Sequence, residues 1–486
     1  MVEWVVAILY TLSLAYLCAF SLGQLHLAII YRRTKVQETS EGKPALVDLP
    51  VVTIQLPVYN EKYVIERLID AVVAIDYPSE KLEIQILDDS TDETSGIIFQ
   101  KLEWIKRTGR DIKHIRRESR KGFKAGALAE ALEQARGEYI AIFDADFIPA
   151  PDFLRKTLPY FADAGIGAVQ TRWGHINKDY SMLTRLQAFG LDAHFSVEQS
   201  GRNAAGSFIN FNGTCGIWRK SCIVDAGGWS DDTLTEDLDL SYRAQLKGWR
   251  FHYLEDVVTP GELPVVMPII KLQQYRWNKG AAETARKMLR HVLHSPITTQ
   301  QKIHAVFHLN NSSVFVALFV AAITSVPMLF IKDNTEALAD LFRMGVVFLL
   351  GFLSVTIFYW TAITHLEQKA ERNFLYLFPA FLIVAMGLSL HNTIAVLEGW
   401  LGIKTPFLRT PKFNIVQKRD SWAGKTYLKA SLGAVTILEG VLSLMFSLAF
   451  IKGIEMNDKT LLLFHAMLAL GFGVVFLQSV KPWANA

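Results

Sequence analysis

The segment Tyr139-Ile140-Ala141-Ile142-Phe143-Asp144-Ala145-Asp146 joins a short apolar run to two carboxylates that stand one residue apart. A run of this kind predicts a buried strand, which we assign to Tyr139–Phe143. Two carboxylates at a strand end can bind a hard divalent cation, and Mg²⁺ or Mn²⁺ suits such all-oxygen ligands. A lone Asp-x-Asp is common by chance and is often only a solvated turn, so its surroundings must decide.

Two apolar runs upstream also end in polar residues. Val51–Leu56 leads into Pro57-Val58-Tyr59-Asn60-Glu61, and Leu82–Leu87 ends at Asp88-Asp89. Stretches with helical spacing of apolar residues separate the three predicted strands, namely Glu61–Ile75 and Phe123–Ala135. Alternating strands and helices predict a mainly parallel sheet with helices on both faces. Because ligands of such sheets bind beyond the carboxyl ends of the strands, the acidic clusters are expected to meet in one site.

The clusters suit the parts of a nucleotide diphosphate. Asp88 and Asp89 can accept hydrogen bonds from a nucleobase edge or a ribose hydroxyl, although Ser90-Thr91-Asp92 fits a helix cap as well. The basic, glycine-containing segment Arg120–Gly126 leads into a helix, and this combination favours phosphate. We expect Lys124 to contact the nucleotide or its diphosphate. The pattern therefore indicates a nucleotide diphosphate held through a divalent metal.

Two later clusters fit the rest of such a site. Thr235-Glu236-Asp237 opens a predicted helix, where the acids could simply favour the helix dipole. The functional interpretation makes Asp237 a general base that takes a proton from an attacking hydroxyl. Gln273-Gln274-Tyr275-Arg276-Trp277 lies on another predicted helix, in which Arg276 can hold diphosphate oxygens and Trp277 can stack on a sugar. A membrane-surface helix with a Trp anchor and a snorkelling Arg fits that segment equally well.

The composition excludes several other classes of protein. A net charge of +3, without a basic stripe of interleaved aromatics, argues against nucleic-acid binding. The three cysteines, Cys18, Cys215 and Cys222, argue against a zinc site and against a disulfide framework. Their pattern suits a reducing compartment. With 51% hydrophobic residues, unevenly spread, the chain is expected to combine a globular domain with membrane segments.

Apolar runs at both ends are long enough to span a bilayer, which takes about 20 residues. Val5–Ile30 is followed by the basic segment Tyr31–Lys35, which predicts a membrane anchor over residues 1–35 and not a cleaved signal peptide. The remaining runs are Ala305–Ile331, Met344–Thr364, Phe374–Leu401, Leu428–Ile451 and Leu461–Val480.

Charge in the linkers sets the expected topology. Gly402–Lys429 holds seven Lys or Arg and one acid, which predicts a cytoplasmic linker, whereas Lys332–Asp340 is mostly acidic and suits the outside. If every run crossed the bilayer, the basic linker would lie outside. We therefore interpret Phe374–Leu401, whose second half is polar, as interfacial or re-entrant, with a sixth span as the alternative. The prediction is five crossings, N-terminus outside and C-terminus inside.

Taken together, these clusters resemble glycosyltransferase family 2, in its processive membrane branch of cellulose, hyaluronan and cellulose-synthase-like mannan or glucan synthases. The D, DxD, TED and Q(Q/R)xRW signatures of that branch match at Asp88/Asp89, Asp144/Asp146, Thr235–Asp237 and Gln273–Trp277. The resemblance covers about the whole chain. It implies a GT-A fold, that is, a mixed, mostly parallel α/β nucleotide-sugar-binding domain inserted between transmembrane helices. It also implies Mg²⁺ or Mn²⁺, a nucleotide-sugar donor and inversion to a β-linkage, with Asp237 as the base.

Two further motifs carry the resemblance. Phe211-Asn212-Gly213-Thr214 is similar to the FNGT of plant-type mannan and xyloglucan-backbone synthases and their bacterial relatives. Phe407-Leu408-Arg409-Thr410-Pro411-Lys412 is similar to the FxVTxK gating loop of bacterial cellulose synthases, with Arg409 where Val is usual. Phe407, Thr410 and Lys412 are thus expected in a cytoplasmic gating loop over residues 403–427.

The expected layout is an anchor at 1–35, a cytoplasmic catalytic domain at 44–262, interfacial amphipathic helices at 263–304 and a transmembrane region at 305–486. The metal ligands are expected to be Asp144 and Asp146. The other expected donor contacts are Pro57, Tyr59, Glu61, Asp88, Asp89, Lys124 and Arg276. The expected acceptor contacts are His175, Asn212, Glu236, Gln273 and Trp277.

The leading hypothesis is a multi-pass enzyme of the inner or plasma membrane. It would move a hexose from UDP-glucose or GDP-mannose to a growing β-linked polysaccharide, with β-1,4 as the expected linkage, and pass the chain through its own membrane helices. The first alternative is a single-addition transferase that makes a glycolipid on a ceramide or prenyl-phosphate acceptor. The second is a transporter or scaffold that only senses nucleotide, against which the intact carboxylates argue. The size of the product separates the three.

Overall fold

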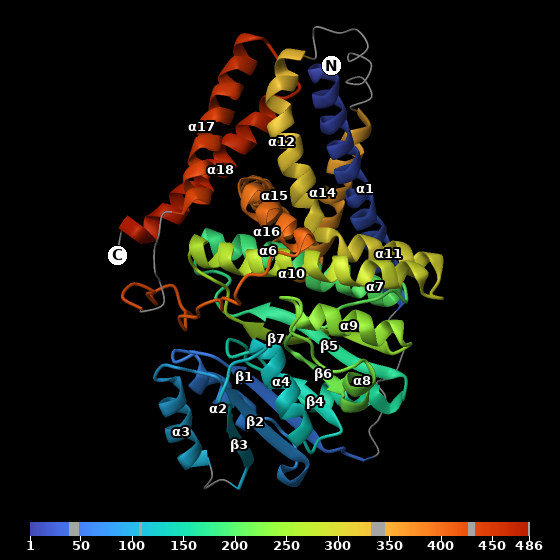
Figure 1. Cartoon of the computed structure of the whole chain (residues 1–486), viewed down its shortest axis with the longest axis vertical. Helices are drawn as coiled ribbons and strands as arrows, with labels where there is room; N and C mark the ends of the chain where they lie inside the picture. Colours follow the sequence, from blue (N-terminus) through green and yellow to red (C-terminus); the bar gives the residue numbers. More distant parts are fainter. Residues whose placement is uncertain (38–47, 106–108, 332–345, 426–432, 485–486) are drawn as a thin grey trace.

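The computed structural model describes residues 1–37, 48–105, 109–331, 346–425 and 433–484. Figure 1 shows apolar helices at one end, a sheet domain at the other, and a layer of helices lying across the chain between them. The N-terminus lies at the end away from the sheet, whereas the C-terminus lies on the sheet side of the apolar helices. The polar clusters thus sit in a domain that is set apart from the apolar bundle.

A seven-stranded sheet forms the centre of the domain, in the order β3-β2-β1-β4-β6-β5-β7. β1 (Val52–Val58) pairs in parallel with β2 (Leu82–Asp88) and with β4 (Tyr139–Ile142). β6 (Gly216–Arg219) runs antiparallel to both of its neighbours, β4 and β5 (Ile166–His175). The predicted mixed, mostly parallel sheet is confirmed, and the carboxyl ends of β1, β2 and β4 meet at one edge.

Three strands had no clear signal in the sequence. β3 (Asp111–Arg116) and β7 (Arg250–Gly261) are the two edge strands, and both carry charged residues along their length. Edge strands expose one row of backbone groups and tolerate charge, so they lack the continuous apolar run of a central strand. β6 has only four residues, too few for a periodic pattern.

Apolar side chains pack against both faces of the sheet. α2 (Ile65–Val73) and α3 (Thr94–Ile105) contribute to the core on one face. In α2 the buried residues Ile65, Leu68, Ile69 and Val72 recur at the spacing of one helix face. α4 (Phe123–Gln134), α8 (Lys220–Asp225) and α9 (Glu236–Leu246) contribute to the core on the other face.

The middle layer contains α6 (Met182–Ala193), α10 (Met267–His294) and α11 (Thr299–Leu309). The expected boundary of this layer at residue 304 is too early, and the expected run Ala305–Ile331 is not one helix. α11 ends at Leu309, and α12 (Val314–Ile331) begins after a short 3-10 helix over Asn311–Ser313. The cause is local, because Asn310 turns its side-chain amide back to the Val306 carbonyl, at 2.9 Å, and ends α11.

Among the residues that the structure describes, five helices are long and apolar enough to cross a membrane. They are α1 (Val2–Gln37), α12, α14 (Val346–Leu366), α17 (Ala434–Glu455) and α18 (Leu462–Ala484). Some expected segments lie outside the described residues: the acidic linker Lys332–Asp340, the start of the runs at Met344 and Leu428, residues 426–429 of the basic linker, and residues 44–47 of the domain.

The expected run Phe374–Leu401 forms two helices, α15 (Ala370–Gly387) and α16 (Ser389–Leu401), bent by 53° at their junction. Glu367, just before α15, forms an ion pair with Lys178 of the sheet domain. Thr405, just after α16, accepts a hydrogen bond from Lys279 of α10 at 2.8 Å. Both ends of the pair therefore lie on the sheet side of the apolar helices, and a bent pair of this kind fits either a broken span or a re-entrant segment.

Candidate active site

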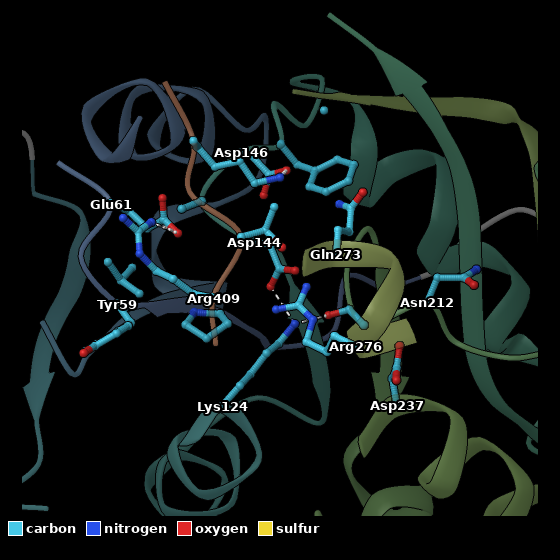
Figure 2. Close-up of a pocket in the computed structure, with 18 of the residues that line it drawn as sticks. Tyr59, Glu61, Lys124, Asp144, Asp146, Asn212, Asp237, Gln273, Arg276 and Arg409 are labelled. Atoms are coloured by element: carbon cyan, nitrogen blue, oxygen red, sulfur yellow. Dashed lines mark hydrogen bonds and ion pairs between the residues drawn. The ribbon is translucent and has the colours of Figure 1, made fainter. Parts of the chain in front are cut away.

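A cavity of about 180 Å³ opens at the carboxyl edge of the sheet, beneath α10 and the loop of residues 402–425. Figure 2 shows side chains from the turns after β1 and β4, from α4, α9 and α10, and from this loop gathered around it. All of the sequence-predicted site residues except Asp88 line the cavity: Pro57, Tyr59, Glu61, Asp89, Lys124, Asp144, Asp146, His175, Asn212, Glu236, Asp237, Gln273, Arg276, Trp277, Phe407, Thr410 and Lys412.

Asp144 and Asp146 follow β4 directly, as the sequence predicted. The Lys124 ammonium lies 2.6 Å from Asp144 Oδ1 (Figure 2). The Lys412 ammonium lies 2.5 Å from Asp146 Oδ2. The Asp144 backbone N–H donates to Thr214 Oγ1 at 2.8 Å, which fixes the turn that carries both carboxylates. In this state each carboxylate is thus neutralised by a lysine.

The two carboxylates fit a divalent cation that is shared with a ligand. No group of three or more His, Cys, Asp or Glu side chains among the described residues is placed to hold a metal by itself. Mg²⁺ usually binds through one or two protein carboxylates, with the other oxygens coming from substrate phosphates and water. The pair Asp144 and Asp146 matches this requirement, and the nearby Lys124 adds positive charge for a phosphate.

Asp237 lies in the first turn of α9, where its Oδ1 accepts the Leu238 N–H at 2.9 Å. Burial raises the pKa of Asp237 to about 7, helped by the Glu236 carboxylate and opposed by Lys124. The adjacent backbone leaves it little room. Gly213 has a φ of +76°, and a Cβ at that position would lie 3.0 Å from Asp237 Oδ2. The glycine of the FNGT-like segment therefore permits the close approach of this carboxylate.

Glu61 and Tyr59, on the turn after β1, face two arginines. Arg409 of the loop pairs with Glu61 Oε1 at 2.9 Å. Burial raises the pKa of Glu61 to about 8, although Arg409 opposes the shift. The Arg120 guanidinium lies 3.3 Å from the centre of the Tyr59 ring, a cation–π contact. Arg120 and Arg409 were not predicted as site residues. The basic segment Arg120–Gly126 could have indicated Arg120 as a site residue. The contact of Arg409 with Glu61 could not be predicted, because it joins segments far apart in the chain.

Asp88 is placed apart from the cavity that was expected to use it. It is 1% exposed, its Oδ1 accepts the Ser90 N–H at 2.8 Å, and its Oδ2 accepts from Ser95 Oγ at 2.5 Å. His114 also contacts Oδ2 at 2.8 Å. Both oxygens are therefore used within the fold, which matches the capping alternative. Asp89 lines the cavity, and Arg117 pairs with its carboxylate through two nitrogens.

The segment Gln273–Trp277 lies on α10, and helical periodicity splits it between two faces. Gln273, Arg276 and Trp277 line the cavity. Gln274 instead accepts a hydrogen bond from Asn392 of α16 at 2.8 Å, and Tyr275 contacts Glu398 of the same helix. Positions three and four apart share a helix face, which explains this division.

Aromatic rings and polar groups form the side of the cavity below α10. The Trp173 and Trp277 ring centres are 6.4 Å apart, and Trp173 also stacks on Phe195. His175 Nε2 lies 3.0 Å from Asp192 Oδ1, so its ring has a fixed orientation. The Asn212 backbone N–H donates to Gln170 Oε1 at 3.0 Å. Flat rings beside oriented polar groups form a surface suited to a sugar.

The loop of residues 402–425 closes the cavity on its remaining side. The Phe407 ring stacks on Phe123 at 5.5 Å between centres, and Arg276 lies 4.9 Å from the Phe407 ring centre. Phe413 and Ile415 are 1% and 0% exposed, packed against α10 and the segment before it. The Phe413 backbone N–H donates to Glu262 Oε1 at 2.9 Å. This loop is held by both apolar and polar contacts.

The chain is similar to known glycosyltransferases. A family model described as "Glycosyltransferase like family 2" matches residues 50–292. Glucomannan 4-beta-mannosyltransferase 1 of Oryza sativa subsp. japonica is 44% identical over 265 residues, which cover 53% of this chain and 51% of the rice protein. Probable glucomannan 4-beta-mannosyltransferase 4 of the same plant is 37% identical over 379 residues, which cover 75% of this chain and 66% of that protein. The chain thus spans about half to two thirds of the length of these curated relatives.

Among solved structures, we compare the chain with a mannosyltransferase of the same fold. The mannosyltransferase PcManGT from Pyrobaculum calidifontis, in complex with GDP-Man and Mn²⁺, aligns with a TM-score of 0.52 and 21% identity, covering 76% of this chain and 99% of that one. Together with the sheet order, the likeness shows a GT-A fold.

Proposed function

This chain belongs to the glycosyltransferase like family 2, and on that premise we propose that it transfers hexose from a nucleotide sugar to a growing β-1,4-linked polysaccharide. The observation that carries the proposal is one cavity that joins the pair Asp144 and Asp146 to Asp237 and to the inner face of α10. The curated relatives are named glucomannan 4-beta-mannosyltransferases, which favours GDP-mannose as donor. UDP-glucose is the second donor to test.

The donor diphosphate is proposed to bind at the carboxylate pair. Asp144 and Asp146 would hold Mg²⁺ or Mn²⁺ together with the diphosphate, and the bound cation would neutralise charge on the leaving group. Lys124 and Arg276 face the same space and would contact the diphosphate oxygens. Arg120 and Tyr59, stacked on each other, would flank the nucleoside.

Asp237 is proposed to accept the proton of the acceptor hydroxyl. As that oxygen forms its bond to the anomeric carbon, the bond from this carbon to the phosphate oxygen breaks, and the electron pair leaves with the diphosphate. The acceptor proton passes to the Asp237 carboxylate. Because one base acts and no enzyme nucleophile is needed, the anomeric configuration inverts. Trp277, His175, Asn212, Glu236 and Gln273 would orient the acceptor sugar at the wall of the cavity.

The loop of residues 402–425 is proposed to gate the donor site. A cavity of about 180 Å³ is small for a nucleotide sugar, since ligand sites usually measure about 300–1,000 Å³. Lys412 occupies the oxygen of Asp146 that a divalent cation would use, and Phe407 fills the space beside Arg276. Donor and metal would thus displace Lys412, after which Phe407, Thr410 and Lys412 could close over the bound nucleotide.

The same proposal includes the membrane. With five crossings and a re-entrant α15–α16 pair, the catalytic domain, the basic linker and the C-terminus would all face the cytoplasm of the inner or plasma membrane. The polysaccharide would leave through the apolar helices above α10. A nucleotide sugar, a polysaccharide acceptor and the bilayer are the partners that this scheme requires.

The test uses the purified chain in detergent with Mn²⁺. Radiolabelled GDP-mannose and UDP-glucose are supplied separately, and the product is sized before and after digestion with a β-1,4-mannanase or a β-1,4-glucanase. We expect a long product from GDP-mannose that the mannanase shortens. Label that is confined to a small lipid-soluble product would overturn polymer synthesis and support the glycolipid alternative.

A further inference from the structure

A second cavity, of about 470 Å³, lies between α1, α7 (Gln199–Ala204) and α11, and it shares no lining residue with the active site. Its walls are mainly apolar and include Phe20, Leu27 and Phe307. Gly23 lies on this wall beside Phe307, and a Cβ at Gly23 would stand 3.4 Å from the Phe307 ring. The cavity therefore has room for a hydrocarbon chain along α1.

The polar part of this cavity contains a buried arginine with unused hydrogen-bonding capacity. Arg202 is 3% exposed, and its Nη2 donates to Glu198 Oε1 at 3.1 Å. Within the described part of the chain, its Nη1 has no hydrogen-bond partner. The other Glu198 oxygen, Oε2, is 2.6 Å from His194 Nδ1, so each oxygen of this carboxylate already has one partner. A buried donor without an acceptor is unfavourable, and a ligand oxygen would relieve it.

Two histidines border the same polar region. The His26 and His304 ring centres are 5.4 Å apart, and both residues line the cavity. Burial lowers the pKa of His304 to about 4, with a further contribution from Arg202. The imidazole is therefore neutral at physiological pH and can donate one N–H without adding charge. Gln300 and Asn311 add further polar groups to the lining.

The position of the cavity determines which ligand can reach it. α1 is a candidate membrane span, and the part of α1 that lines the cavity lies toward the end of this helix that meets the middle layer. Figure 1 shows α11 and α7 beside this end of α1, between the apolar helices and the sheet domain. An apolar wall at this depth meets lipid tails, and a polar floor meets lipid headgroups.

We propose that this cavity binds one phospholipid, with its phosphate on Arg202 Nη1 and one acyl chain along α1 past Gly23. The phosphate supplies the oxygen acceptors that a guanidinium prefers. The chain fills apolar volume that water would occupy poorly. The site is independent of the proposed transfer reaction, so the failure of either proposal leaves the other intact.

The experiment is native mass spectrometry of the purified full chain after lipid removal in detergent. Three probes are added in turn: dioleoylphosphatidylglycerol, dioleoylglycerol with the same chains but no phosphate, and inorganic phosphate. We expect one bound phosphatidylglycerol, at least tenfold weaker binding of dioleoylglycerol, and no phosphate adduct. Equal binding of the two lipids, or an adduct with phosphate alone, would overturn the proposal.

Variants separate this site from general attraction to lipid. Arg202→Gln removes the guanidinium, and Gly23→Leu blocks the hydrocarbon path without changing charge, so each should weaken phosphatidylglycerol binding at least tenfold. Arg33→Gln removes a charge from an exposed position on the same helix and should bind as the unaltered chain does. If Gly23→Leu binds normally, or if Arg33→Gln loses as much as Arg202→Gln, the lipid is not held in this cavity.

Discussion

The carboxyl of Asp237 is the group whose protonation should control the reaction. Its pKa is raised to about 7 by burial and by Glu236. Only the deprotonated form accepts a proton, so the initial rate should fall about tenfold per pH unit below 7 and level off above it. The measurement is the rate of label transfer between pH 5.5 and 8.5 at saturating donor and metal.

A matched variant tests the cause of this shift. Glu236→Gln removes the negative charge that helps to raise the pKa of Asp237, so the falling limb should move to lower pH. A rate that stays constant down to pH 5.5 in the unaltered chain would contradict the assignment of Asp237 as the base.

Individual site residues could be predicted from the sequence where a carboxylate stood directly at the end of a predicted strand. Asp144 and Asp146 could be predicted because they directly follow an apolar run. Asp88 and Asp89 could not be told apart, since neighbouring residues at a strand end point to opposite sides and no pattern says which side faces the ligand. The contact of Arg409 with Glu61 joins residues far apart in the chain, so no local signal announces it.

At the scale of elements, Gly280 allows α10 to pack closely against the start of α9. A Cβ at Gly280 would lie 2.5 Å from Thr235 Cγ2 and 2.9 Å from the Thr235 backbone nitrogen. Gly280→Ala should therefore push α10 away from the start of α9 and separate Arg276 and Trp277 from Asp237. We expect turnover to fall about 100-fold, the size of effect that a 1 Å misplacement can produce.

The control for this variant is Gly96→Ala in α3, where nothing lies within 4 Å of the new Cβ. The same change should leave turnover unaltered there, since only helix propensity differs. Transfer rates and melting temperatures of both variants should be measured together. Normal turnover in a folded Gly280→Ala protein would show that α10 need not approach α9 so closely.

The loop of residues 402–425 should depend on Phe413 for its docking. Phe413 is 1% exposed, and truncation of a buried Phe to Ala typically costs about 3–5 kcal/mol. Phe413→Ala should therefore raise the rate at which trypsin cleaves after Lys418 and Arg419, both exposed. Leu408→Ala, on the same loop but 57% exposed, is the control and should be cleaved like the unaltered chain. Equal cleavage of all three proteins would mean that Phe413 does not hold the loop.

At the level of elements, strong periodicity allowed prediction and its absence prevented it. The strands β1, β2 and β4 and the helices α2 and α4 could be predicted from apolar spacing. The break between α11 and α12 was missed, because the apolar character of Ala305–Ile331 masks the short polar group at Asn310–Ser313. The path of the loop of residues 402–425 could not be predicted, since its sequence has no repeating pattern.

Across the whole molecule, a buried ion pair ties the middle layer to the apolar helices. Lys271 of α10 lies 2.9 Å from Glu439 of α17, whose side chain is 0% exposed. Glu439→Gln would leave the Lys271 charge buried and unpaired, which typically destabilises by about 3–5 kcal/mol. We expect a lower melting temperature in detergent, with recovery in the double variant Lys271→Met/Glu439→Leu. An unchanged melting temperature in Glu439→Gln would show that the pair does not support the assembly.

The predicted membrane topology rests on a conflict between the charge of the linkers and the number of apolar runs. A cytoplasmic basic linker needs an odd number of crossings before it, whereas counting every apolar run gives four. The polar second half of Phe374–Leu401 was the reason to leave that run out of the count. The 53° bend between α15 and α16 fits a re-entrant segment and a broken span alike, so the count of five crossings stays a prediction. The path that a polymer would take through the helices depends on packing between distant segments. No local sequence pattern predicts that packing.

The most direct test of the account compares donor binding and turnover in Asp237→Asn and Asp146→Asn, with GDP-mannose and Mn²⁺. If the cavity separates donor binding from proton removal, Asp237→Asn should bind the donor almost normally and lose turnover at least 100-fold. Asp146→Asn should instead lose metal-dependent donor binding. Near-normal turnover in Asp237→Asn, or normal metal-dependent binding in Asp146→Asn, would contradict the central claim.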